Sequence, residues 1–198
     1  KHDIISTKAE TLRSLRGILT KSRIEKPFIF KVSDWKKNPD RILEMIQKIF
    51  SDKYLVVRSS AIGEDSFKES LAGKYNSVLG VESSNKSSIR KAIESVINSY
   101  GSSKGIEENN QILVQRQVGN VEISGVILTR DIKTGAPYYI INYDDNSSTD
   151  SVTKGIANKV VKISQFYDSK DSLGKWGRLI ESVNELEKVI PGFPLDIE

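Results

Sequence analysis

The chain has 198 residues, of which 37% are hydrophobic, so it can bury the core of one large domain or of two smaller lobes. Its 30 Lys and Arg residues nearly balance its 26 Asp and Glu residues, and the net charge of +4 is scattered, which argues against a primary role in nucleic-acid binding. The sequence has no apolar run long enough to span a bilayer and no Cys for disulfides or thiolate chemistry, so we expect a cytoplasmic protein. The only His, His2, lies in a terminal segment and is expected neither to catalyse nor to bind metal. Because the chain starts with Lys and ends abruptly at Glu198, we interpret it as a fragment of a longer protein.

The first fifty residues predict three elements. Residues 8–22 carry Leu12, Leu15, Ile18 and Leu19 at helical spacing, with Ser6 or Thr7 available as the N-cap. Residues 27–32 are expected to form a strand and residues 34–40 a loop. The apolar residues between 42 and 50 follow the helical period closely and predict a packing helix.

The central stretch of residues 54–81 combines two predicted strands with groups that bind phosphate. A short apolar run at residues 54–57 ends in Arg58, followed by Ser59 and Ser60. A guanidinium presents several N–H donors in a fixed fork that suits phosphate oxygens, and hydroxyls can donate beside it. The stretch therefore predicts an anion site at the end of a strand.

A small-residue loop follows at residues 70–75 and opens the next extended run. Gly73 would let backbone N–H groups approach an anion, and Lys74 adds a positive charge. The alternative is that Arg58 pairs with Glu64 or Asp65 and that Gly73 is an ordinary hairpin residue.

The second half of the chain predicts mainly antiparallel sheet. A helix over residues 89–100 ends at the stretch GSSKG, residues 101–105, which we take as the boundary between a first lobe (1–105) and a second lobe (106–198). The expected strands are residues 111–118, 122–130, 138–143 and 159–163, and the second and third of these form a hairpin. A long helix is expected over residues 173–190, up to Pro191.

The last residues carry a candidate metal site. In an extended segment Asp196 and Glu198 point to the same side, as two oxygen ligands of one hard cation would require. The alternative is a solvated pair of acidic residues.

The run VRSSAIGEDS followed by SLAGKYNSVLGV resembles the N-terminal nucleotide-binding domain of phosphoenolpyruvate synthase and pyruvate phosphate dikinase, an ATP-grasp-like family. The stretch Ser124 to Gly135 is similar to the hairpin that lies over the nucleotide in that family. The resemblance implies an α+β fold with two lobes, mixed or antiparallel sheets and flanking helices. It also implies ATP and Mg²⁺ as cofactors and phosphoryl transfer as the activity.

The resemblance assigns a role to individual residues. Lys8 falls where the family has Gly-Gly-Lys, so Lys8 and Arg58 would be the catalytic residues that hold the triphosphate. Asp196 and Glu198 match a Pro-x-Asp-Ile-Glu strand that supports Mg²⁺. The nucleotide-binding residues that it implies are Lys8, Arg58, Ser70, Gly73, Lys74, Gln115, Gln117, Val118 and Arg130.

The sequence departs from the family pattern at two places. Ser6 and Thr7 replace the usual glycines before Lys8, which restricts close backbone approach, and Asp150 or Ser151 stands where the family has a Glu. The variant stretch around Ser151 is similar to the L-glutamine kinase branch of the family.

In the resembled enzymes ATP phosphorylates a His on a separate domain, and the phosphoryl group then passes to pyruvate or another small acceptor. We therefore expect downstream phosphohistidine and acceptor-binding domains on the same longer chain as partners. Three alternatives stay open: an L-glutamine kinase of capsule phosphoramidate biosynthesis, a non-catalytic nucleotide-binding module, and a basic interaction domain that binds nucleic acid.

Overall fold

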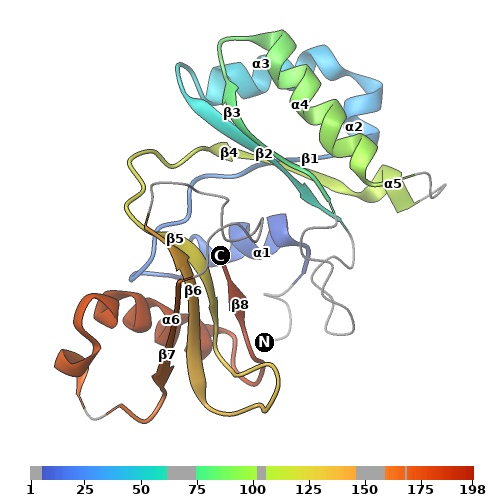
Figure 1. Cartoon of the computed structure of the whole chain (residues 1–198). Coiled ribbons are helices and arrows are strands. Elements are labelled where there is room, and N and C mark those ends of the chain that lie inside the picture. Colours follow the sequence, from blue (N-terminus) through green and yellow to red (C-terminus); the bar gives the residue numbers. More distant parts are fainter. Residues whose placement is uncertain (1–5, 62–74, 102–105, 146–158, 168) are drawn as a thin grey trace. The chain divides into compact units, whose positions relative to one another are not determined.

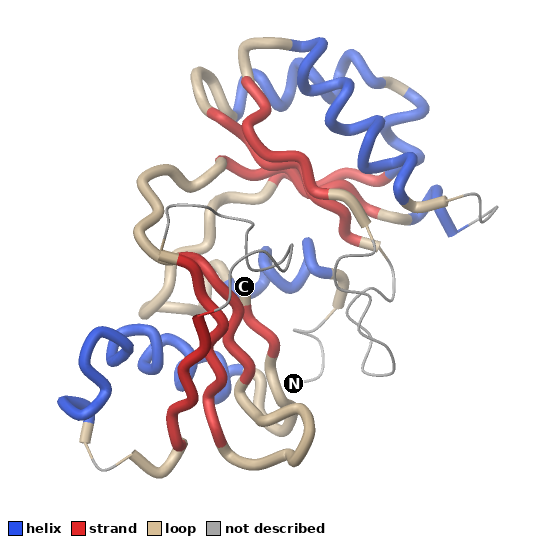
Figure 2. Tube along the Cα trace, viewed as in Figure 1, coloured by secondary structure: helices blue, strands red, loops and turns tan. Residues whose placement is uncertain are grey.

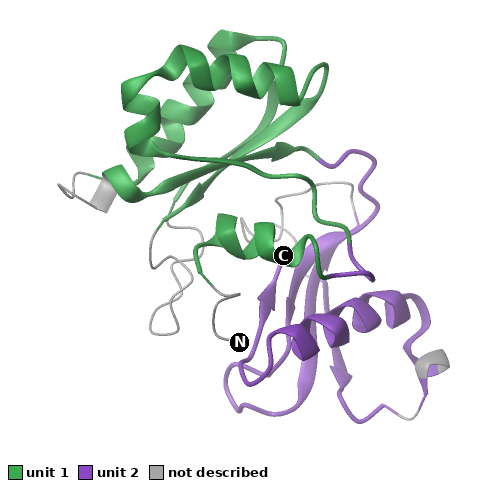
Figure 3. Ribbon diagram, turned by 180° about the vertical axis from the view of Figure 1, so that it is seen from behind, with its two compact units in different colours: residues 1–18, 23–117 green, residues 19–22, 118–198 purple. Residues whose placement is uncertain are grey.

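The computed structural model describes residues 6–61, 75–101, 106–145, 159–167 and 169–198 (Figure 1). The chain forms two compact units: unit 1 contains Lys1–Ile18 and Arg23–Gln117, and unit 2 contains Leu19–Ser22 and Val118–Glu198 (Figure 3). Each unit combines one antiparallel sheet with helices, so the expected α+β fold is confirmed (Figure 2). Within the described ranges no helix has the length and apolar content needed to cross a membrane.

The sheet of unit 1 has the strand order β1-β4-β2-β3, and all its neighbours are antiparallel. Its strands are β1 (Phe28–Lys31), β2 (Tyr54–Ser60), β3 (Ser77–Glu82) and β4 (Gln111–Arg116). The sequence placed the strand at residues 111–118 in a second lobe, after a boundary at residue 105. The unit boundary instead falls after Gln117, because β4 pairs along its length with β1 and β2.

Helices cover one face of this sheet and a further helix lies on the other (Figures 1 and 3). The covering helices are α2 (Val32–Lys37), α3 (Pro39–Ile49) and α4 (Lys86–Ser99), and the short α5 (Ile106–Asn109) precedes β4. On the opposite face lies α1 (Lys8–Leu15).

The alternation of side chains along β2 decides which residues enter the core. Leu55 and Val57 are fully buried in the apolar cluster that the helices complete, together with Ile112 and Val114 of β4. Because successive side chains of a strand point to opposite faces, Arg58 lies on the other face of the sheet. Directly paired residues share a face, which places Leu113 and Gln115 on the side of Arg58.

Residues 34–40 were expected to form a loop, and this prediction is wrong. The helix α2 begins at Val32 because Val32 and Trp35, three residues apart, are both buried in the core of unit 1. The carboxylate of Asp34 accepts the Lys31 N–H at 3.2 Å and so caps the first turn.

The first helix is shorter than the periodicity of residues 8–22 predicted. It ends at Leu15, and the following segment Leu19–Ser22 belongs to unit 2. The carboxylate of Glu185 accepts hydrogen bonds from the Thr20 N–H at 2.9 Å, the Thr20 hydroxyl at 2.6 Å and the Lys21 N–H at 2.8 Å. The chain therefore passes between the units three times, after Ile18, after Ser22 and after Gln117.

The sheet of unit 2 has the order β7-β6-β5-β8 and is also antiparallel. It consists of β5 (Ser124–Leu128), β6 (Tyr138–Asp144), β7 (Lys159–Ser164) and β8 (Asp196–Ile197). The pairing of β5 with β6 confirms the expected hairpin. The helix predicted over residues 173–190 is divided at Gly174, whose φ of 52° is not helical, into a 3₁₀ segment (Lys170–Trp176) and α6 (Gly177–Val189).

The core of unit 2 lies between its sheet and α6, where Ile127, Tyr139 and Ile141 pack on Ile180 and Val183. The Tyr139 hydroxyl lies 2.5 Å from the Asn184 amide oxygen and 2.9 Å from a carboxylate oxygen of Glu187. Burial and the neighbouring Glu187 carboxylate raise the pKa of Tyr139, because both disfavour the phenolate.

The strands β5 and β6 approach closely at Gly125. A Cβ atom at this position would lie 2.2 Å from the carbonyl oxygen of Asn142 and 3.0 Å from the Cα of Tyr143. Only Gly fits here without displacing the backbone of β6. The Gly of the stretch SGV is thus required by the packing of the hairpin.

Candidate functional site

Arg58 is half-buried near the end of β2, on the sheet face that carries α1. It lies opposite Leu113 of β4 on one side and Ser77 of β3 on the other. Ser60, two residues further, points to the same face. A cation held at a strand end and partly shielded from water is suited to bind an anion.

The first turn of α1 is fixed to this strand end. The Ala9 N–H donates to the hydroxyl of Ser60 at 2.9 Å. The hydroxyl of Thr7 donates to the side-chain oxygen of Gln111 at 2.6 Å, and the amide nitrogen of Gln111 donates to Glu10 at 3.0 Å. Lys8 lies between these anchored residues, so the structure brings Lys8 and Arg58 to the same part of unit 1.

The sequence indicated for Tyr100 only that it is the last residue of the helix predicted over residues 89–100. In the structure its hydroxyl accepts the Ser60 N–H at 2.9 Å and donates to the Gln111 carbonyl at 2.5 Å. Tyr100 thereby joins the end of β2 to the start of β4. No periodic signal in the sequence marks this contact, because the partners are a backbone N–H and a backbone carbonyl.

The side-chain amides of Gln115 and Gln117 bond to the backbone of unit 1. Gln115 is buried and donates to the Glu25 carbonyl at 2.9 Å. The oxygen of Gln117 accepts the Gly80 N–H at 2.6 Å, at the irregularity of β3 where Gly80 has a φ of 69°. In the described structure these two amides hold the backbone at Glu25 and at Gly80.

In unit 2, Arg130 and Val118 lie on loops. Arg130 donates to the side-chain oxygen of Gln165 at 2.6 Å, and the amide nitrogen of Gln165 donates to the Thr129 carbonyl at 2.7 Å. Val118 is exposed to 59%. Arg130 is thus oriented by the segment that follows β7.

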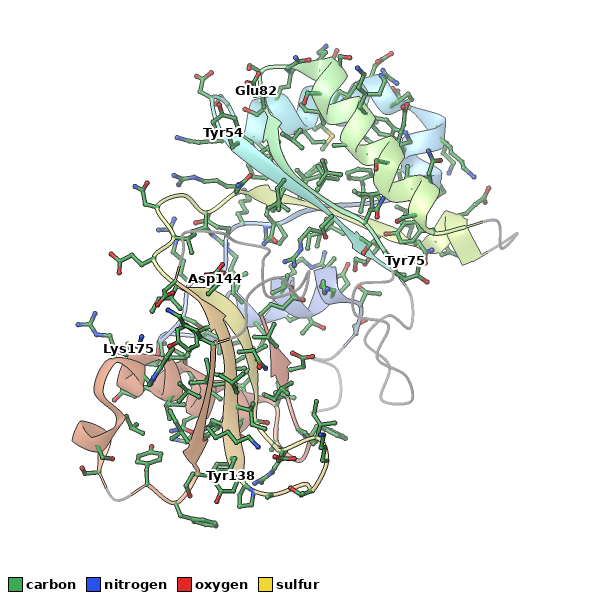
Figure 4. The ribbon with its side chains drawn as sticks, viewed as in Figure 1. Tyr54, Tyr75, Glu82, Tyr138, Asp144 and Lys175 are labelled. Atoms are coloured by element: carbon green, nitrogen blue, oxygen red, sulfur yellow. The ribbon has the colours of Figure 1, made fainter. Side chains whose placement is uncertain are left out.

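Asp196 and Glu198 lie at the end of the chain in and after β8. Ile197 pairs with Ile127 and packs against the apolar core beneath α6, so the side chains of Asp196 and Glu198 point to the other face of the sheet. In this sheet β5 lies between β8 and β6, and Figure 4 shows the two ends of β6 at Tyr138 and Asp144.

The donors at this strand are carboxylate oxygens, the kind of ligand that hard cations bind. In the part of the chain that the structure describes, no three His, Cys, Asp or Glu residues form a group that could hold an ion. Carboxylate oxygens such as those of Asp196 and Glu198 are ligands that Mg²⁺ accepts, and Mg²⁺ usually takes one or two carboxylates and completes its shell with phosphate oxygens and water.

Several predicted residues lie outside the described residues. These are the loop residues Ser70, Gly73 and Lys74, the alternative partners Glu64 and Asp65, and the variant positions Asp150 and Ser151.

A protein-family model described as "pyruvate phosphate dikinase, AMP/ATP-binding domain" matches residues 31–163. The matched range contains Arg58, Gln115, Gln117, Val118 and Arg130. The range leaves out Lys8, Asp196 and Glu198. A search of curated proteins found no match.

Solved structures with similar chains include the dinucleotide-forming acetyl-coenzyme A synthetase 1 of Ca. Korarchaeum cryptofilum, in complex with coenzyme A, Ca-AMPCP and HgCl+. The identity is 16%, 96% of this chain and 70% of that chain are covered, and the TM-score is 0.45. Another is PH1788 from Pyrococcus horikoshii Ot3, with 15% identity, 91% and 72% coverage and a TM-score of 0.47. Because the family model spans more than half of the sequence, the chain belongs to the family of pyruvate phosphate dikinase AMP/ATP-binding domains.

Proposed function

We propose that this chain binds ATP with Mg²⁺ and holds a phosphoryl group of ATP for transfer. The observation that carries the proposal is the family match over residues 31–163, a range that includes Arg58. Arg58 lies on the same face of β2 as Ser60, which binds the first turn of α1, where Lys8 lies. Phosphoryl transfer depends mainly on positioning and charge neutralisation, so a pair of cations beside the phosphates is the equipment that it needs.

Unit 1 would contribute the groups that bind phosphate. The Arg58 guanidinium donates to phosphate oxygens through its planar fork, and the Lys8 ammonium adds a point charge. Ser70, Gly73 and Lys74 would complete this set. The backbone of residues 115–118 would pair with adenine, while the side chains of Gln115 and Gln117 keep that backbone in shape through Glu25 and Gly80.

Unit 2 carries the proposed metal ligands, Asp196 and Glu198, together with Arg130 as a further nucleotide contact. The Mg²⁺ would supply positive charge to the phosphate oxygens. The two carboxylates would hold it from the sheet face that points away from α6.

By analogy with the resembled enzymes, the phosphoryl group would pass to a His on a further domain of a longer chain; the single His of this sequence, His2, lies outside the described residues. The final acceptor would be pyruvate or another small molecule, L-glutamine among them. Steady ATP-dependent product formation by this chain without an added domain would contradict this arrangement.

A second candidate is a nucleotide-binding module that does not cleave ATP. It is favoured by Thr7, which stands where the family has Gly and whose hydroxyl is committed to the N-cap of α1 and to Gln111. Retention of bound ATP without cleavage in the full-length parent protein would support this candidate over transfer.

The test is a thermal melt with and without Mg-ATP on the wild type and on Arg58→Ala. A ligand at about 100 times its Kd stabilises the folded state by about 2.7 kcal/mol, a shift of several degrees in a chain of this size. Loss of a charge-assisted contact of about 1.5–3 kcal/mol predicts affinity at least about tenfold weaker for Arg58→Ala.

The matched control is Arg41→Ala, because Arg41 is exposed on α3. We expect this variant to keep the full shift. An equal shift in the wild type and in a folded Arg58→Ala variant would refute the assignment of Arg58. A shift that no longer responds to Mg²⁺ in Asp196→Asn, with ATP binding retained, would support the metal assignment.

A further inference from the structure

Tyr100 follows the last turn of α4 and reaches the end of the unit 1 sheet with its hydroxyl. The residue is 8% exposed, and its ring makes an edge contact with Tyr75 at a centroid distance of 5.2 Å. Its hydroxyl accepts the Ser60 N–H and donates to the Gln111 carbonyl. The phenol is thus held by both packing and hydrogen bonds.

The two partners of this hydroxyl face each other across the ladder of β2 and β4. Ser60 pairs with Gln111, and at the other end of the ladder the Gln117 N–H donates to the Tyr54 carbonyl at 2.8 Å. Hydrogen-bonded and non-hydrogen-bonded pairs alternate along an antiparallel ladder. Tyr54 and Gln117 form a hydrogen-bonded pair, and Ser60 and Gln111 lie an even number of residues further along the ladder, so they also occupy a hydrogen-bonded position. The Tyr100 hydroxyl bonds both members of this terminal pair and fixes the separation of the strand ends.

The same pair carries the first turn of α1 on the other face of the sheet. The Ser60 hydroxyl, in a residue with no exposed surface, accepts the Ala9 N–H. The Gln111 side chain holds Thr7 and Glu10. Lys8 therefore lies between Thr7, which is bonded to Gln111, and Ala9, which is bonded to Ser60. Tyr100 joins Ser60 to Gln111.

We propose that Tyr100 is a positioning residue for Lys8: its hydroxyl fixes Ser60 and Gln111, and these fix the turn from which the Lys8 ammonium reaches phosphate. This inference rests on the proposed function. In this arrangement Tyr100 would change ATP affinity through Lys8 and not through a contact of its own with the nucleotide.

The test is a double-mutant cycle on the 198-residue chain, with the dissociation constant of Mg-ATP measured by calorimetry. Tyr100→Phe keeps the ring and removes the hydroxyl, and we expect it to weaken ATP affinity about three- to tenfold, the range for residues that act through others. In a Lys8→Ala background the same substitution should leave the affinity unchanged within about twofold, because the group through which Tyr100 acts is gone.

A second variant keeps the inference testable if Tyr100→Phe fails to fold. Ser60→Ala removes only the acceptor of the Ala9 N–H and should show the same dependence on Lys8. Its matched control is Ser83→Ala, because Ser83 is also buried and accepts a backbone N–H, from Lys53 at 3.0 Å. The control for Tyr100→Phe is Tyr54→Phe, at the opposite end of β2, near Glu82 in Figure 4. Both controls should bind ATP like the wild type.

The outcomes separate this inference from the proposed function. If the wild type binds Mg-ATP and Lys8→Ala weakens it, but Tyr100→Phe and Ser60→Ala bind normally, the inference fails and the function stands. Additive effects of Tyr100→Phe and Lys8→Ala would also overturn it, since they would show a general structural loss. A wild type that binds no Mg-ATP would refute the proposed function itself.

Discussion

Glu185 accepts both the backbone N–H and the hydroxyl of Thr20, at 2.9 and 2.6 Å, although 165 residues separate the two in sequence. A third bond comes from the Lys21 N–H, and the Ser182 hydroxyl donates to the Lys21 carbonyl at 2.9 Å. These contacts attach the segment Leu19–Ser22 to α6 of unit 2. Three of these four hydrogen bonds are accepted by the Glu185 carboxylate.

Stability should therefore depend on the protonation of Glu185. The bond from the Thr20 hydroxyl, followed by that from the Lys21 N–H, holds the pKa of Glu185 below its usual value of 4.5. Because the folded pKa is lowered, the stabilisation is complete above the unfolded pKa and is lost as the pH falls through the folded value. Between about pH 6 and pH 3, we expect the melting temperature of Glu185→Gln to fall less than that of the wild type.

The control for this measurement is Glu44→Gln, which removes a carboxylate whose side chain is 69% exposed on α3. It should keep the acid sensitivity of the wild type. Parallel melting curves for the wild type and Glu185→Gln across the acid range would contradict the role of Glu185.

Gly125→Ala should destabilise the protein strongly. The new Cβ would lie 2.2 Å from the Asn142 carbonyl oxygen, a backbone atom that cannot rotate away. Overpacking of this kind costs about 1–3 kcal/mol or more, so the midpoint of urea unfolding should fall clearly. Gly17→Ala is the matched control, because a Cβ at Gly17 has nothing within 4 Å. Equal midpoints for the two variants would show that β6 can move away from β5.

Tyr139→Phe should lower the free energy of unfolding by about 1 kcal/mol, since it removes the hydroxyl beside Asn184 and Glu187 while keeping the buried ring. In a chain of this length that corresponds to a fall of about 2–4 °C in melting temperature. The adjacent Tyr138 is 40% exposed, and Tyr138→Phe provides the same chemical change at the surface. A loss of equal size in both variants would mean that the hydrogen bonds of Tyr139 contribute nothing.

Local patterns in the sequence predicted several elements well. The β5–β6 hairpin follows from two apolar runs separated by turn residues, and α3 follows from a regular apolar stripe. The short helix α2 was missed because its evidence is only one pair of buried residues, Val32 and Trp35, and the Asp34 cap. A run of six residues is too short for a period to be recognised.

Contacts between distant segments could not be predicted from such patterns. The strand β4 was assigned to the wrong lobe because an apolar run does not indicate which strands it joins, and pairing with β1 and β2 is a property of the whole sheet. For the candidate site, the family motif indicated Arg58, yet nothing local indicated that Ser60 would accept the Ala9 N–H or that Tyr100 would bond Ser60. These are single hydrogen bonds to backbone groups, which any residue can offer.

The three passages of the chain between the units limit how the protein can be recombined. A gene segment encoding residues 118–198 would omit Leu19–Ser22 and leave Glu185 and Ser182 without the partners they hold in the structure. A chimera that exchanges unit 2 with that of a relative must therefore carry two separate stretches of sequence and match them to each other.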